Sequence, residues 1–279
     1  MIWTRKHCIP LELIFVVVVG MPSWGAQGAQ QAEQPPLQPD LPNPVVAPET
    51  PPPPPAKPGT LTLENRADIF MARKAYPDAV DNYRRALQEG GRGDGAVWNK
   101  LGIAYQQMQN MNAARRAYKE AIRIRKDFPE PWNNLGTTYY LEKKAKKSLK
   151  YYREAIKLNP QSASFHVNLG TAYYATKKIP EAIEEYRTAL SLDPAVLTQR
   201  SNVGTTVSAR TADAKFFFYM GKVFASLGRV DDAVRYLRHA FEDGFDDFKL
   251  LDSDEDYKKI SALPAYKELR AHPPKGIKE

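Results

Sequence analysis

Apolar and small residues recur three and four positions apart from residue 60 to residue 271, with polar residues between them. That spacing places one apolar stripe on each of a series of amphipathic helices. The pattern also repeats at long range: PWNNLGTTYY at 131–140 is matched by AVWNKLGIAY at 96–105 and by SFHVNLGTAY at 164–173, with the Leu-Gly pairs 34 residues apart. A fixed period of this length predicts a helical solenoid, because no single unit can bury its own apolar face.

Each unit contains two predicted helices. If the opening Trp is the fourth residue of a unit, the five units are 60–93, 95–128, 129–162, 163–196 and 214–247. In units two to four, a glycine at position 8 of the unit lets the two helices approach closely, and a tyrosine at position 24 fills the space between them. These residues are Gly102, Gly136 and Gly170, with Tyr118, Tyr152 and Tyr186.

This spacing closely resembles the tetratricopeptide repeat, a helix–turn–helix unit of 34 residues, over about 170 of the 279 residues. The resemblance implies an all-α fold, a right-handed α-α superhelical solenoid of five repeats. Units one and five depart from the pattern, as terminal repeats with one face in water should. The apolar residues of 248–271 are expected to form a C-terminal helical cap over unit five, before a tail at 272–279.

Three segments outside the repeats have other compositions. Residues 1–25 combine a basic start, a short apolar run and small residues before Gly25, which predicts a signal peptide cleaved after Gly25 or, alternatively, retained as an anchor. Residues 26–59 hold 12 of the 23 prolines and are expected to be a disordered linker. Residues 197–213 suggest a small β-hairpin or a disordered loop. We therefore expect an exported protein, periplasmic or secreted, with no membrane span after cleavage.

Catalytic chemistry has little support in the sequence. His166, His239 and His272 lie far apart, and no glycine-rich phosphate loop or nucleophile elbow is present. Asp252, Asp254 and Asp256 begin like a calcium loop, but the turn glycine and closing glutamate are missing, so a helix cap explains them better. We expect no enzyme activity, no cofactor and no metal.

Positive charge is concentrated in units two and three. The chain carries a formal charge of +8, and these units contain 7 basic with 2 acidic residues and 7 basic with 3 acidic residues. A solvated surface explains this pattern, and docking to an anionic envelope component (polymer, lipid or acidic protein) is the alternative. Export and the lack of interleaved aromatic residues argue against nucleic acid. The candidate patch comprises Arg115, Arg116, Lys119, Lys143, Lys144, Lys146, Lys147 and Lys150.

The resemblance implies that ligands bind the concave surface formed by the first helices. Asparagines there offer a donor and an acceptor to a peptide backbone, and tyrosines can stack on apolar side chains; the alternative is that these asparagines belong to the fold and bind only water. The candidate ligand residues are Asn65, Asn99, Lys100, Gln106, Asn133, Asn134, Tyr140, Asn168, Tyr174, Tyr219 and Lys222. We expect the asparagines to be exposed without ligand, so that replacing them changes stability little.

One function that the resemblance suggests is disfavoured. A clamp for the C-terminal carboxylate of a chaperone needs lysine or arginine at three set positions, where this chain has Asn99, Ser164 and Asn168, although Asn134 stands where the clamp needs an asparagine. No cation is available there to pair with a carboxylate. The sequence therefore predicts a non-catalytic scaffold for extended protein segments, with the partner and the oligomeric state undetermined.

Overall fold

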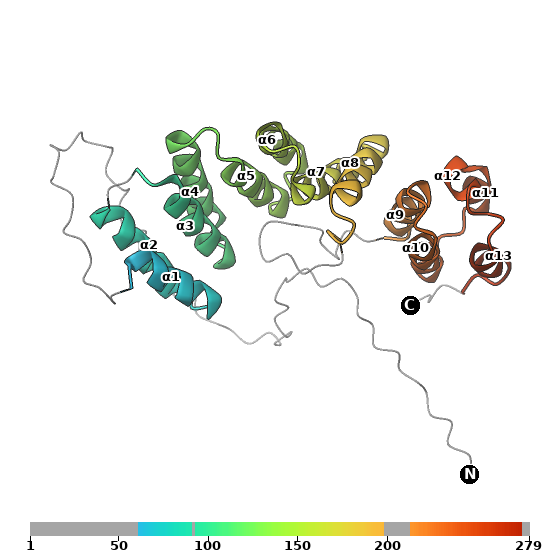
Figure 1. Ribbon diagram of the computed structural model, residues 1–279, viewed down its shortest axis with the longest axis horizontal. Coiled ribbons are helices and arrows are strands. Elements are labelled where there is room, and N and C mark those ends of the chain that lie inside the picture. The colour runs from blue at the N-terminus through green and yellow to red at the C-terminus, as the bar shows by residue number, and fades with distance from the viewer. Residues whose placement is uncertain (1–60, 91–92, 198–212, 275–279) are drawn as a thin grey trace, which may run out of the picture.

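The computed structural model describes residues 61–90, 93–197 and 213–274, which form thirteen helices and no strand (Figure 1). Ten of these helices pair in sequence, one pair in each predicted unit. The pairs are α1 (Leu63–Ala72) with α2 (Tyr76–Glu89), α3 (Gly95–Gln107) with α4 (Met111–Ile124), α5 (Pro129–Leu141) with α6 (Ala145–Leu158), α7 (Ala163–Ala175) with α8 (Ile179–Leu192), and α9 (Ala214–Ser226) with α10 (Val230–Glu242). The all-α solenoid is therefore confirmed.

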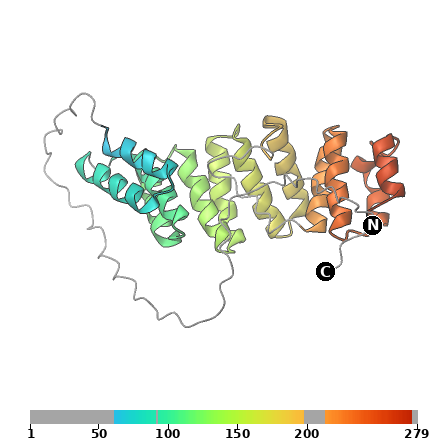
Figure 2. The same cartoon turned by 90° about the horizontal axis from the view of Figure 1, so that it is seen from below.

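The pairs follow one another along a single line, and the cap closes the far end (Figure 2). First helices of neighbouring units contact one another, α3 with α5 and α5 with α7, more closely than the second helices do. The first helices therefore lie on the inner side of the curve. Side chains on these helices that point away from the second helices therefore belong to one continuous inner surface.

The turn inside each unit has the same backbone conformation. Its central residue has a positive φ of 59° at Lys74, 60° at Gln109, 61° at Lys143, 63° at Lys177 and 70° at Gly228. In unit three, the Lys143 amide donates to the Tyr140 carbonyl and the Lys144 amide donates to the Tyr139 carbonyl, which closes the end of α5. This is the Schellman arrangement, which satisfies the last carbonyls of a helix.

The glycines at position 8 face the tyrosines of the second helix, as the sequence predicts. A Cβ added to Gly102 would lie 2.5 Å from the Tyr118 ring, and one added to Gly136 would lie 2.8 Å from the Tyr152 ring. All three tyrosines are buried. Only glycine permits this approach, so the pair fixes the distance between the two helices of a unit.

Unit five achieves the same packing with a residue from outside the repeat. Its position 24 is Leu237, and a Cβ on Gly221 would instead clash with the hydroxyl of Tyr257. Tyr257 belongs to α12 (Glu255–Lys258), is fully buried, and donates to the Phe218 carbonyl at 2.8 Å. With α11 (Phe248–Ser253) and α13 (Pro264–Ala271), α12 forms the helical cap.

Several sequence predictions lie outside the described residues. These are the signal peptide, the proline-rich linker, most of the 197–213 insertion and most of the tail after 271. Within the described residues, one apolar cluster runs from Leu149 to Leu269 and a second joins units one and two. None of the described helices has the length and apolar character needed to cross a membrane.

Candidate interaction surface

Four asparagine side chains on the first helices form a directional chain of hydrogen bonds. Asn168 Nδ2 on α7 donates to Asn133 Oδ1 on α5 at 2.8 Å. Asn133 Nδ2 then donates to Asn134 Oδ1 at 3.2 Å, and Asn134 Nδ2 donates to Asn99 Oδ1 on α3 at 3.0 Å. These hydrogen bonds therefore link units four, three and two through side chains alone. We call these four residues the amide chain.

The amide chain is buried, and the expectation that its members are exposed is wrong. Their exposed fractions are 7% for Asn99, 2% for Asn133, 4% for Asn134 and 1% for Asn168. Position 6 of one unit lies against position 5 of the unit before, so the amides satisfy one another. A buried amide needs such partners, since an unpaired polar group in the interior is costly.

An ion pair continues the same contact toward the N-terminus. Lys100, at position 6 of unit two, bonds Glu64 Oε1 and Asp68 Oδ2 of α1, both at 2.7 Å. The two acids raise the pKa of Lys100 against the opposing effect of burial. Asp68 also accepts from the Tyr83 hydroxyl at 2.5 Å, and burial is the main cause of the raised pKa of Tyr83. Units one to four are thus joined along their inner side by polar bonds.

Tyr174 is another candidate ligand residue that the structure buries. It is 6% exposed, its hydroxyl donates to Asp213 Oδ1 at 2.6 Å, and its ring meets Phe216 edge-on at 5.3 Å. Asp213 caps the N-terminus of α9 and also accepts from the Phe216 amide. Tyr174 is therefore buried where the sequence predicts a ring free to stack on a ligand, because it joins α7 to the N-terminus of α9.

The remaining candidates keep part of their surface. Asn65 is exposed, and Lys100, Gln106, Tyr140, Tyr219 and Lys222 are half-buried. Gln106 accepts from the Tyr118 hydroxyl at 3.0 Å, and Lys222 bonds Asp254 of the cap at 2.6 Å. Tyr140 and Tyr219 pack one side against the core. The inner surface therefore exposes part of each of these tyrosine rings, whereas the amide chain is buried.

In unit four, a histidine–glutamate pair takes the place of an aromatic contact. Positions 4 and 23 are Trp132 and Tyr151 in unit three, with ring centroids 6.4 Å apart. In unit four they are His166 and Glu185, with Nδ1 and Oε2 2.6 Å apart. His166 Nε2 faces the Pro160 carbonyl at 3.1 Å, so both ring nitrogens meet acceptors. The hydrogen bond to Glu185 raises the pKa of His166.

The pairing of His166 with Glu185 was not predicted from the sequence, where His166 was considered only as one of three separated histidines. The signal was available, since a basic and an acidic residue stand where the neighbouring unit has two aromatic rings in contact. The role of Tyr257 was also missed, and the leucine at position 24 of unit five was its signal.

Comparisons with known proteins agree with the geometry. The tetratricopeptide repeat models match residues 129–162 and 163–196, the bounds of units three and four, and a TPR repeat model matches residues 102–143. The chain is a tetratricopeptide repeat protein. Its fold supports a role as a protein–protein interaction scaffold.

Solved structures of other tetratricopeptide proteins are similar at low identity. MamA from Desulfovibrio magneticus RS-1 is 16% identical with a TM-score of 0.47, over 64% of this chain and 92% of that one. TTC0263 from Thermus thermophilus is 18% identical with a TM-score of 0.45, over 67% and 93%. YrrB, titled a TPR protein with an unusual peptide-binding site, is 18% identical with a TM-score of 0.45, over 68% and 89%. No curated protein sequence matches the chain.

Two of the eight candidate basic residues in the tetratricopeptide array, Arg115 and Lys144, bond an acid of this chain. Arg115 is 15% exposed, bonds Glu142 at 2.5 Å and lies over the Tyr139 ring, so it contributes to the joint between units two and three. Lys144 bonds the other oxygen of Glu142 at 2.9 Å. Hydrogen bonds from Lys144, which has the larger effect, and from Arg115 lower the pKa of Glu142. The exposed members are Arg116, Lys119, Lys143, Lys144, Lys146, Lys147 and Lys150.

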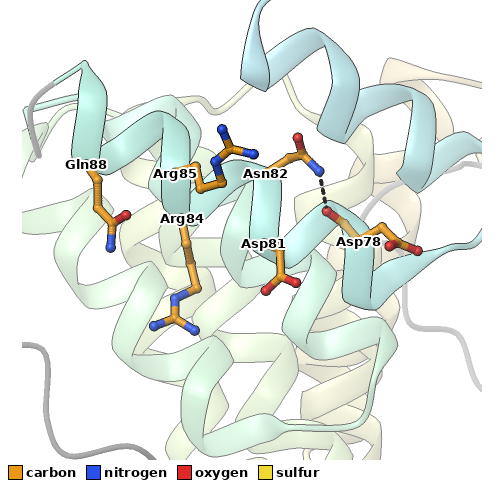
Figure 3. A pocket seen from close by; sticks show the side chains of 6 residues that line it. All are labelled: Asp78, Asp81, Asn82, Arg84, Arg85 and Gln88. Atoms are coloured by element: carbon orange, nitrogen blue, oxygen red, sulfur yellow. Dashed lines mark hydrogen bonds between the residues drawn. The ribbon is translucent and has the colours of Figure 1, made fainter.

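A surface hollow lies along the outer helix of the first tetratricopeptide unit. Its six lining residues all belong to α2, and the Asn82 amide donates to the Asp78 carbonyl at 2.8 Å (Figure 3). Two acids are followed along the helix by two arginines, so the charges of the lining sum to zero. Among the described residues, no group of three or more His, Cys, Asp or Glu side chains is placed to hold a metal ion.

Proposed function

We propose that this chain is a non-catalytic scaffold that binds an extended protein segment along the inner face of its first helices. One observation supports the proposal: the amide chain and the Lys100 ion pairs join the inner sides of units one to four, where Tyr140 keeps exposed surface, and Tyr219 keeps exposed surface on the first helix of unit five. A surface held rigid before binding loses little conformational freedom when it binds.

The structure changes which residues should contact the segment. Because the buried asparagines bond one another, contacts come from the half-buried tyrosines rather than from an asparagine ladder. Tyrosine suits this role, since it offers a large apolar ring and a hydroxyl with few rotatable bonds. Lys100 and Lys222 flank the tyrosines and hold acids of this chain, which leaves aromatic and backbone contacts as the main source of affinity.

A displayed random peptide library provides a direct test. Peptides that bind the full chain should lose affinity for Tyr140→Ala and Tyr219→Ala variants by about tenfold or more each, as interface tyrosines do. A Lys146→Ala/Lys147→Ala variant is the control and should bind normally, because these lysines lie on α6, away from the inner face. Loss of binding in the lysine variant with full binding in the tyrosine variants would move the function to the basic residues.

We place the scaffold in the cell envelope, on the signal-peptide pattern of residues 1–25. Fractionation of a bacterial host and sequencing of the mature N-terminus test this. A protein that starts at Ala26 and leaves with the periplasmic fraction supports export. Full-length protein in the cytoplasm contradicts it.

A further inference from the structure

The turns inside units two to four lie on one edge of the solenoid, because α3, α5 and α7 pack side by side and bond one another at matching positions. Each turn joins the C-terminus of a first helix to the N-terminus of a second helix, and the helix pairs stand side by side (Figure 2). Arg115 of unit two reaches Glu142 in the turn of unit three, which shows that neighbouring turns adjoin. We call the turns of units two to four, with the helix ends beside them, the turn edge. Its residues are Met108, Gln109, Leu141, Glu142, Lys143, Lys144, Lys146, Lys147, Lys177, Lys178 and Glu181.

Lysines occupy backbone positions on this edge that favour glycine. Lys143 and Lys177 have φ values of 61° and 63°, in the left-handed region where Gly228 stands in unit five. A residue with a Cβ is disfavoured there by about 1 kcal/mol relative to glycine. Both side chains are exposed, and the Lys177 ammonium lies 5.9 Å from the centroid of the Tyr174 ring. Lys74 and Gln109 have the same backbone conformation and are also exposed, so the turn presents its central side chain to solvent in each of these units.

The charge of the turn edge is strongly positive in unit three, and unit four adds Lys177. Lys143, Lys146, Lys147 and Lys177 are exposed. The carboxylates on the same edge have cation partners, because Glu142 bonds Arg115 and Lys144, and Glu181 lies 3.6 Å from Lys178. The exposed lysines are therefore available to an external anion.

Two exposed apolar side chains stand among these cations. Met108, directly before the turn residue of unit two, is 42% exposed, and Leu141, at the end of α5, is 40% exposed. Single apolar residues on a surface are ordinary. Leu141 stands two residues before Lys143, and an apolar side chain next to lysines suits the boundary between lipid headgroups and acyl chains.

We propose that the turn edge of units two to four docks on an anionic lipid surface. The lysines meet headgroup phosphates, and Met108 and Leu141 enter the headgroup layer. A flat layer of anions fits a row of projecting turns, whereas a peptide fits the inner face. The two surfaces are separate, so the chain can hold a protein segment while it lies on a membrane.

Vesicle co-sedimentation of the full chain tests the proposal. Wild type should bind vesicles that contain phosphatidylglycerol better than vesicles of phosphatidylcholine alone, and the preference should fall as salt is raised. A Lys143→Gly/Lys177→Gly variant keeps the turn conformation and removes two charges, so its affinity should fall about thirtyfold. The control combines Gln109→Gly with Lys119→Gln and Lys157→Gln, which makes the same net charge change off the edge, and should bind like wild type.

The remaining outcomes each overturn the proposal. Equal binding of wild type and the double-glycine variant to anionic vesicles would show that the turn lysines are not involved. Equal loss in the control would show a dependence on total charge alone. Binding to soluble polyglutamate without binding to vesicles would assign the edge to an acidic protein. Residues 1–25 are common to all variants, so any contribution from them cancels in these comparisons.

Discussion

Asn65 and Asn134 occupy the same position of their units but differ in environment. Asn65 is exposed in unit one, the first unit that the structure describes, and Asn134 is 4% exposed between Asn99 and Asn133. The role of an asparagine in this array therefore depends on whether a neighbouring unit supplies a partner. A side chain that would be free in an isolated unit becomes part of a joint when the units stack.

Replacing Asn134 tests this difference. Asn134→Ala removes the acceptor of Asn133 and the donor to Asn99, and it should lower the free energy of unfolding by about 1–3 kcal/mol. Asn65→Ala is the matched control and should leave stability unchanged. Urea unfolding of both variants decides the matter. Equal stabilities would mean that the amide chain contributes nothing to the fold.

His166 should make stability depend on pH. Its two nitrogens face Glu185 and the Pro160 carbonyl, so the site is fully satisfied only when the ring is protonated. Its pKa is raised, so the stabilisation is complete below the unfolded pKa of about 6.5 and is lost as pH rises through the folded pKa. Unfolding free energies measured across this range should fall with rising pH.

Variants of the histidines identify the source of that slope. His166→Phe, which installs the residue type of position 4 in unit five, should flatten the dependence. His239→Gln should preserve it. A slope that survives His166→Phe would assign the pH dependence to another group.

The glycines at position 8 offer a graded test of helix contact. Alanine at Gly102 would place Cβ 2.5 Å from the Tyr118 ring, alanine at Gly136 2.8 Å from Tyr152, and alanine at Gly170 3.2 Å from Tyr186. Overpacking of this kind costs about 1–3 kcal/mol, and the loss should be largest at Gly102 and smallest at Gly170. Gly93, with nothing within 4 Å of an added Cβ, is the control. Thermal melts that show a different order would contradict the steric account.

At the scale of the helices, the cap is a replacement for missing repeat residues. Tyr257 reaches Gly221 and donates to the Phe218 carbonyl, and its ring lies 5.3 Å from that of Phe218. Phe218 in turn stacks on Phe245 at 4.4 Å. The last unit is thus completed by a segment that lacks the repeat pattern.

Removing this side chain should loosen the end of the array. Tyr257→Ala leaves a cavity between α9 and α12, and it should cost about 3–5 kcal/mol and expose apolar surface. Lys258→Ala changes an exposed neighbour and should be neutral. Urea unfolding followed by light scattering would show both effects. A Tyr257→Ala variant as stable as wild type would mean that the cap packs by other contacts.

The helix pairs could be read from the sequence, whereas the contacts between units could not. Period and apolar spacing are properties of one chain segment, so Gly102 and Tyr118 indicated their own packing. Whether Asn99 and Asn134 are buried depends on the distance between neighbouring units. The sequence of a single unit does not determine that distance. Their pairing had a signal, because asparagine at position 6 of units three and four follows asparagine at position 5 of the preceding unit.

At the scale of the whole molecule, the joints between units differ in kind. Units one to four are joined on the inner side by ion pairs and amides, from Glu64 to Asn168. Unit five is joined to unit four by the Tyr174 hydroxyl on Asp213, by aromatic edges, and by hydrogen bonds from Arg187 to Ser226 and from Arg229 to the Pro194 carbonyl. Stability in a solenoid is a sum of unit and joint contributions, so each of these joints contributes separately to the stability of the array.

The amide chain also determines which unit can be copied. Unit three carries asparagine at both positions 5 and 6, so a second copy of 129–162 would accept from Asn168 and donate to the first copy, which lengthens the chain by one link. Unit four carries Val167 at position 5, so a copy of 163–196 would place its own asparagine against an apolar side chain. Gene duplication can therefore lengthen this array at unit three, while unit four acts as the terminator of its inner seam.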